Sequence, residues 1–98
     1  MEIKKDKFYI VRAKDAGVFF GKIAEKGDHE VTMTEVRKVW YWDGACAVEQ
    51  LAEEGTTNPD GCKVTVTVSE MVIADPIQII PCTDRAYESL AKVGVWKR

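Results

Sequence analysis

The segment from residue 37 to residue 43 carries the side chains of this sequence that are best suited to binding chemistry. It places two cations before three adjacent aromatic residues, with an acid after them: Arg37, Lys38, Val39, Trp40, Tyr41, Trp42 and Asp43. Aromatic surface beside a guanidinium is typical of base stacking, cation–π contacts and interface hot spots. If the segment is extended, Trp40 and Trp42 share one face and Tyr41 points to the other. Lys38 then lies on the tryptophan face and Arg37 on the tyrosine face.

Two interpretations of these rings are open at the level of the sequence. In the first, Trp40 and Trp42 close the domain's own core while Lys38 extends past them to solvent. In the second, the rings of Trp40, Tyr41 and Trp42 form an open surface that meets a ligand or partner, and Arg37 neutralises an anionic group on it.

Arg12 is a second candidate for contact with an anion. It lies in phase with Phe8 and Ile10, whose side chains could face the interior. An unpaired guanidinium is costly to bury, so an inward Arg12 would need an acid such as Asp43 or an anionic ligand. An outward Arg12 would be an ordinary surface residue.

No residue pattern in the sequence predicts an enzyme, a metal site or a cofactor. His29 is the single histidine and falls in a predicted turn, and Cys46 lies near a helix start with no base beside it in the sequence. The other cysteines, Cys62 and Cys82, are widely spaced and form no CxxC pair, which favours reduced thiols over disulfides or a zinc site. The glycines are scattered singly and form no phosphate-binding loop. We therefore expect a non-enzymatic protein that holds no cofactor and no metal.

The elements that must position the 37–43 segment are mostly strands. A shift in the apolar phase between Val31–Met33 and Val36–Val39 predicts a bulge or kink near Thr34–Glu35, with residues 36–42 as a bent continuation or as a new strand. Alternation of Val with Lys or Thr makes 63–68 the clearest strand of the chain. Strands are expected at residues 8–12, 18–24, 30–33, 36–42, 63–68, 71–73 and 77–80.

Two helices complete the predicted secondary structure. The first covers 45–54, with Asp43 as a candidate N-cap and Gly55 at its end. The second covers 84–93, is capped by Thr83 and directs Ala86, Leu90 and Val93 to the sheet. The fold class expected is α+β, mainly β: one domain over residues 1–98, with a small, strongly curved antiparallel sheet or a partly open SH3-like or Sm-like barrel and two short helices.

Composition and charge exclude several classes of protein. The chain has 98 residues, of which 46% are hydrophobic and 31% charged, as in an ordinary globular domain. A net charge of −2 provides no field that attracts nucleic acid or anionic lipid, so nucleic-acid binding is not expected. We find neither a signal peptide nor an apolar stretch long enough to cross a bilayer, and we expect a cytoplasmic protein.

Several segments of the chain resemble a family of short, uncharacterised proteins from bacteriophages and prophages, notably those of gut bacteria. The segments that carry the resemblance are Tyr9–Arg12, Ala16–Gly21, Val36–Ala45, Leu51–Gly55 and Ile77–Thr83. The resemblance implies a viral or prophage setting and carries over no functional residue. In that setting we expect a homo-oligomeric binding protein, which could sequester a small anionic or nucleotide-like ligand. The alternative is a structural or assembly component of the virion that contacts other phage proteins.

Overall fold

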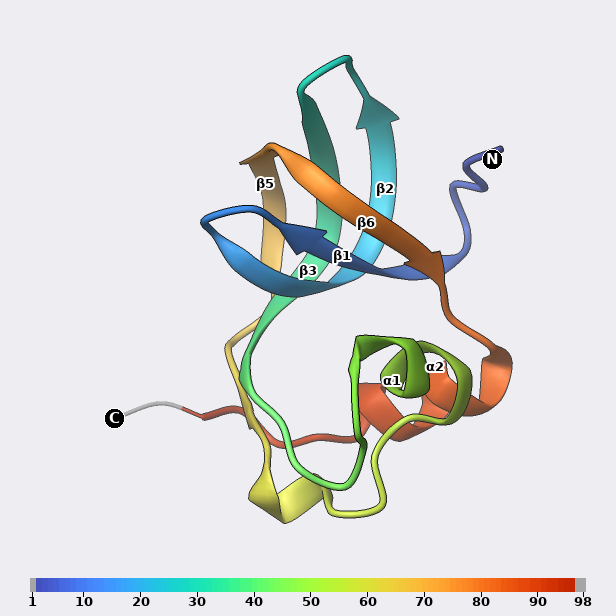
Figure 1. The fold of residues 1–98 in the computed structure, drawn as a ribbon, viewed down its shortest axis with the longest axis vertical. Helices are drawn as coiled ribbons and strands as arrows, with labels where there is room; N and C mark the ends of the chain where they lie inside the picture. The colour runs from blue at the N-terminus through green and yellow to red at the C-terminus, as the bar shows by residue number, and fades with distance from the viewer. Residues whose placement is uncertain (1, 97–98) are drawn as a thin grey trace.

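Three consecutive strands form an antiparallel meander in the computed structural model, which describes residues 2–96. They are β1 (Phe8–Ala13), β2 (Gly17–Lys26) and β3 (Glu30–Tyr41), and each pairs with the next in the chain (Figure 1). Short turns rich in Gly and Asp connect them, which favours antiparallel pairing. The strands predicted at residues 8–12, 18–24 and 30–33 are confirmed.

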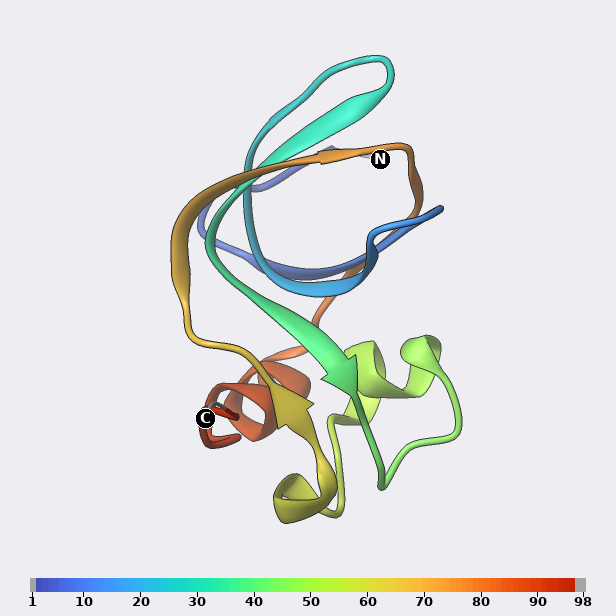
Figure 2. The ribbon, with the colours of Figure 1, turned by 90° about the vertical axis from the view of Figure 1, so that its left-hand side faces the viewer.

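The second half of the chain adds strands to both sides of the meander. β4 (Lys63–Val64) and β5 (Val68–Ala74) both pair with β3, whereas β6 (Pro76–Pro81) pairs with β1. The six-stranded sheet has the order β4-β3-β2-β1-β6, with β5 on β3 beside this path. A corner at Asp75 connects β5 to β6, and the sheet curls strongly without closing (Figures 1 and 2). The predicted mainly β, α+β fold with a strongly curved antiparallel sheet is confirmed.

A bend at Glu35 allows β3 to pair with two different strands on one side. Phe20 pairs with Arg37 and Lys22 with Thr34, so β3 holds one extra residue between these two pairs. Glu35 itself has a φ of 48°, an uncommon value for a residue with a side chain. Residues from Glu30 to Val36 pair with β5, and Val39 and Tyr41 farther along pair with β4. The bulge predicted near Thr34–Glu35 is confirmed, and 36–41 continues the same strand.

The bend brings β2 and β3 into close contact at Gly21. A Cβ atom added there would lie 2.8 Å from the Cα of Val36 and 3.0 Å from the carbonyl oxygen of Thr34. Only glycine fits this approach without movement of the backbone.

The strand predicted at 63–68 is wrong, because the chain leaves the sheet at residues 65–67. The amide of Thr65 donates to the carbonyl oxygen of Lys38 at 3.0 Å, and its hydroxyl accepts from the Lys38 amide at 2.9 Å. Here the chain passes the bend of β3 on its way from β4 to β5. The valine alternation breaks as a result: Val64 is buried, whereas Val66 is 46% exposed.

Two helices lie beneath one end of the sheet (Figures 1 and 2). α1 (Val48–Glu54) begins three residues later than predicted, after Ala47, and ends at Gly55 with a φ of 77°. α2 (Asp84–Ala91) is capped by Thr83, whose hydroxyl accepts from the Ala86 amide at 3.1 Å, as predicted. A short 3₁₀ turn, Pro59–Gly61, precedes β4.

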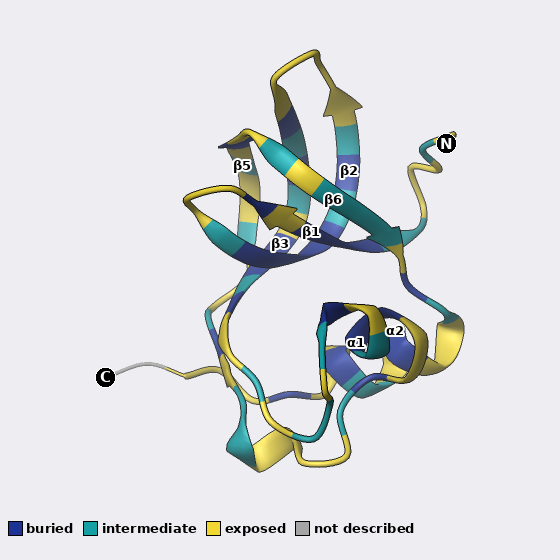
Figure 3. Cartoon of the chain, viewed as in Figure 1, coloured by how far each residue is buried: buried dark blue, intermediate teal, exposed yellow. Residues whose placement is uncertain are grey.

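Buried residues lie on both the strands and the helices (Figure 3). Their side chains form two cores, one on strands alone and one between strands and helices. The strand core consists of Tyr9, Val11, Ala13, Phe19, Ile23, Val31, Met33, Val36 and Ile73. The helix core consists of Ile10, Val18, Phe20, Val39, Val48, Leu51, Ala52, Val64, Cys82, Ala86, Leu90 and Val93.

Candidate functional site

Three exposed aromatic rings surround one lysine ammonium at the far end of β3. The Nζ atom of Lys63 lies 5.2 Å from the ring centroid of Trp40, 5.9 Å from that of Tyr41 and 5.4 Å from that of Trp96. The indoles of Trp40 and Trp96 stack, with centroids 4.9 Å apart and an interplanar angle of 17°. All three distances are within the range of cation–π attraction. We call Trp40, Tyr41, Lys63 and Trp96 the aromatic–lysine cluster.

A second bulge in β3 exposes two neighbouring rings at once. Val39 pairs with Val64 and Tyr41 with Lys63, so Trp40 is an extra residue between the two pairs. Bulges redirect side chains in this way. Trp40 is 55% and Tyr41 51% exposed, although strict alternation predicts opposite faces for them. The predicted alternation is therefore wrong at this point of the strand.

Trp42 is separated from the other two rings of the segment. It is half-buried and packs against the helix core. Trp42 therefore lies as the core-closing interpretation expects, whereas Trp40 is exposed.

Trp96 reaches the cluster because the chain after α2 returns along β4. Val95 forms a parallel bridge with Val64, and the Trp96 amide donates to the Val64 carbonyl at 2.8 Å. Sequence analysis missed both Trp96 and Lys63, since neither is near residue 40 in the chain. A tryptophan in the short tail after the second helix is the signal in the sequence that could have pointed to Trp96.

Arg37 lies on β3, three residues before Trp40, and is buried, with 7% of its surface exposed. Its Nε donates to the carbonyl of Thr65 at 2.9 Å, and its two terminal nitrogens donate to those of Leu90 at 3.5 Å and Gly94 at 3.2 Å. Burial lowers its pKa. The guanidinium thus joins β3 to the β4–β5 crossing and to the end of α2, where a cation suits the negative end of the helix dipole.

The remaining candidates lie at some distance from the rings. Lys38 is half-buried, with its Nζ 6.0 Å from the ring centroid of Phe19. Arg12 is exposed on β1, and within residues 2–96 it forms no ion pair with Asp43. The pKa of Glu49 is lowered chiefly by a hydrogen bond from Gln78 and to a lesser extent by the charge of Arg12.

Asp43 organises a loop instead of capping α1, so the predicted N-cap is wrong. One of its carboxylate oxygens accepts from the Gly44 amide at 2.9 Å, and the other from the side-chain amide of Asn58 at 3.0 Å. Ala47 occupies the N-cap position and has no oxygen in its side chain.

Other reactive groups are dispersed over the part of the chain that the structure describes. In residues 2–96, no three His, Cys, Asp or Glu side chains gather in a way that could hold a metal ion. The three thiols are unpaired, and burial raises the pKa of Cys82 to about 12. Of the helices described, none is long and apolar enough to cross a membrane.

A comparison with protein-family models identifies the chain's relatives. The model described as "Domain of unknown function (DUF6948)" matches residues 6–90. The chain belongs to this family. The family match includes Trp40, Tyr41 and Lys63 and stops before Trp96. No curated protein and no solved structure matches the chain.

Proposed function

We propose that the protein is a non-enzymatic binding protein of a phage or prophage, and that the aromatic–lysine cluster binds a planar anionic ligand of the nucleotide class. The single observation that carries the proposal is the gathering of three exposed rings around one ammonium group. The phage setting rests on the resemblance of the five segments given above. The host cytoplasm is the location that goes with this role.

The exposure of the rings supports contact with another molecule. Trp40, Tyr41 and Trp96 are 55%, 51% and 41% exposed, although all three are large and mostly apolar. Tryptophan and tyrosine dominate the binding energy of interfaces and provide stacking faces for bases. Grouped exposure of such rings marks binding surfaces more often than it serves stability.

The charge of Lys63 supports an anionic ligand. The rings hold the ammonium group at the surface, where it can also contact a phosphate or carboxylate. Within residues 2–96 the one ion pair is Lys22–Glu35, so no acid neutralises Lys63. A ligand with a flat ring and a negative group would use both components of the cluster.

Quenching of tryptophan fluorescence tests this proposal. We expect saturable quenching by AMP or GMP, and about tenfold weaker binding in the Trp40→Ala variant, since a base stacked on an indole contributes about 1 to 3 kcal/mol. Adenosine, which lacks the phosphate, and ribose 5-phosphate, which lacks the base, should both bind more weakly than AMP. Tyr87→Ala, which removes a 40% exposed ring outside the cluster, is the matched control and should leave the affinity unchanged. The proposal fails if no nucleotide gives saturable quenching, or if Trp40→Ala binds as tightly as the wild type.

Self-association is part of the proposed role. Two of the edge strands, β5 and β6, each pair with a single strand, and these edges and the small size of the domain favour a homo-oligomer. Sedimentation velocity should show a mass that rises above that of one chain with concentration. A strict monomer at all concentrations would contradict this part of the proposal.

A virion component is the second candidate, and it is favoured by apolar side chains on the edge strands. Val72 on β5 and Ile77 on β6 are each 58% exposed. Such edges can pair with other chains of a particle. Mass spectrometry of purified particles would detect the protein if this role is correct, and its absence from them would leave the ligand-binding role.

A further inference from the structure

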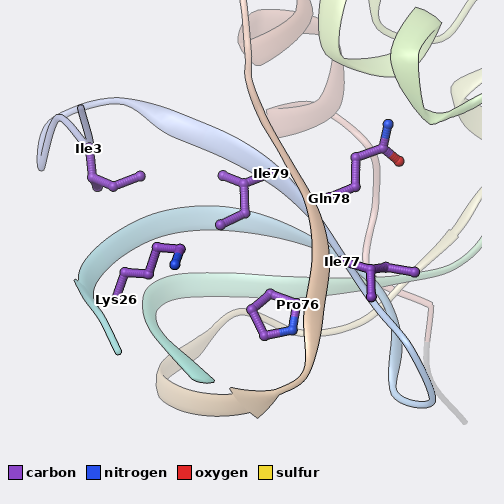
Figure 4. A pocket seen from close by; sticks show the side chains of 6 residues that line it. All are labelled: Ile3, Lys26, Pro76, Ile77, Gln78 and Ile79. Carbon is purple, nitrogen blue, oxygen red and sulfur yellow. The ribbon is translucent and has the colours of Figure 1, made fainter. Parts of the chain in front are cut away.

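A hollow of about 380 Å³ lies where the curled sheet stays open, away from the aromatic–lysine cluster. It lies between β6, the end of β2 and the segment before β1 (Figure 4). Its lining residues are Ile3, Lys26, Pro76, Ile77, Gln78 and Ile79. A volume of this size is within the range of small-molecule sites.

Most of the lining is apolar and continues into the strand core. Ile3 and Ile79 are half-buried and pack against the strand core. Figure 4 shows both side chains on the same side of β6, while Gln78 points away from them. The Gln78 amide instead donates to Glu49 on α1 at 2.9 Å. The wall of the hollow formed by Ile3 and Ile79 therefore favours hydrocarbon.

Lys26 is the one charged residue of the lining. Its Nζ donates only to the carbonyl of Gly27 in its own turn, at 3.4 Å, which is a weak bond. No carboxylate of residues 2–96 forms an ion pair with it. An apolar hollow with one unneutralised cation is complementary to a molecule with an apolar body and a single negative group.

We propose that this hollow binds a medium-chain carboxylate, with the hydrocarbon chain against Ile3 and Ile79 and the carboxylate at Lys26. A single flexible lysine suits a carboxylate, because both groups carry one charge. The volume fits a chain of about six to ten carbon atoms, the size of a small ligand. This site is independent of the proposed nucleotide surface.

NMR titration of the ¹⁵N-labelled full chain with hexanoate, octanoate and decanoate tests the inference. We expect saturable shifts confined to the amides of Ile3, Lys26 and residues 77–79. The affinity should rise about two- to fourfold for each CH₂ that is buried. Decanol, which keeps the chain but lacks the charge, should bind about three- to fivefold more weakly than decanoate.

Matched variants locate the anion. Lys26→Gln should weaken decanoate binding about three- to fivefold, because an exposed charge pair contributes little more than this. Lys92→Gln, another exposed lysine on a different part of the chain, should have no effect. Trp40→Ala should also leave decanoate binding intact, which separates this inference from the proposed nucleotide surface. The inference is overturned if the shifts do not saturate, if they map elsewhere, or if Lys26→Gln binds decanoate as the wild type does.

Discussion

At the scale of single residues, Arg37 shows how the fold accommodates a buried cation without an acid. Its guanidinium donates to three main-chain carbonyls, on Thr65, Leu90 and Gly94. Two of these belong to the end of α2 and the tail that carries Trp96. The residue predicted to meet an anion thus joins the elements on which the aromatic–lysine cluster is built.

Replacing Arg37 by methionine should lower the free energy of unfolding by about 2 to 4 kcal/mol, because hydrogen bonds to charged donors are strong and the acceptors lose their partner. The stability of the Arg37→Lys variant should lie between that of the wild type and that of Arg37→Met, since one ammonium group cannot reach all three carbonyls. Urea denaturation followed by circular dichroism measures both. Arg12→Met, on an exposed arginine, should change stability by less than about 0.5 kcal/mol. An Arg37→Met protein as stable as the wild type would contradict this role.

The buried thiol of Cys82 makes the free energy of unfolding depend on pH in the alkaline range. Burial raises the pKa of its thiol from 9.0 to about 12, so between these values the unfolded chain loses this proton and the folded chain keeps it. The contribution of this thiol to the free energy of unfolding is therefore fully present below pH 9 and is lost as the pH rises toward 12. The loss from this thiol between pH 8 and pH 10 should be about 1 kcal/mol.

Urea denaturation of the Cys82→Ala variant at both pH values measures the effect, since its stability should fall by about 1 kcal/mol less than that of the wild type. Cys46→Ala, at an exposed thiol, is the control and should keep the wild-type dependence. Equal pH dependence in the Cys82→Ala variant and the wild type would refute the assignment.

At the scale of elements, the bend of β3 determines which surface the aromatic residues reach. Between Val36 and Val39, just beyond the bulge at Glu35, the partner strand changes from β5 to β4, and the bulge at Trp40 exposes two adjacent rings. Gly21 allows β2 to pass close to the first bulge.

Gly21→Ala should cost about 1 to 3 kcal/mol of stability, because the added methyl group would overlap the backbone of Val36. Gly94→Ala is a matched control, since nothing lies within 4 Å of a Cβ atom at that position. Its stability should stay within about 0.5 kcal/mol of the wild type. Thermal unfolding compares the two variants, and equal melting temperatures would show that the close approach does not restrict residue 21.

The same elements show what the sequence could and could not predict. The first bulge was predictable, because Val31 and Met33 are out of phase with Val36 and Val39. The cap at Thr83 was predictable from local chemistry. The end of β4 after Val64 was not, because the break at residues 65–67 depends on a partner strand that bends. The position of Trp96 beside Trp40 depends likewise on how the tail packs, and local patterns carry no information about this.

At the scale of the whole molecule, the protein keeps its two candidate sites apart. One is the aromatic–lysine cluster, where β3, β4 and the C-terminal tail meet, and the other is the hollow at the open side of the sheet. The helix core stabilises the first through α2 and its tail, whereas the second borders the strand core. Ligands at one site should therefore leave the shape of the other unchanged.

The central claim is that the rings around Lys63 are a binding surface, and the indole N–H signals of a ¹⁵N-labelled protein test it most directly. On titration with AMP, we predict saturable shifts of the Trp40 and Trp96 signals, while the signal of the half-buried Trp42 stays in place. Assignment by single Trp→Phe variants identifies each signal. Three unmoved indole signals, or shifts of Trp42 alone, would contradict the account.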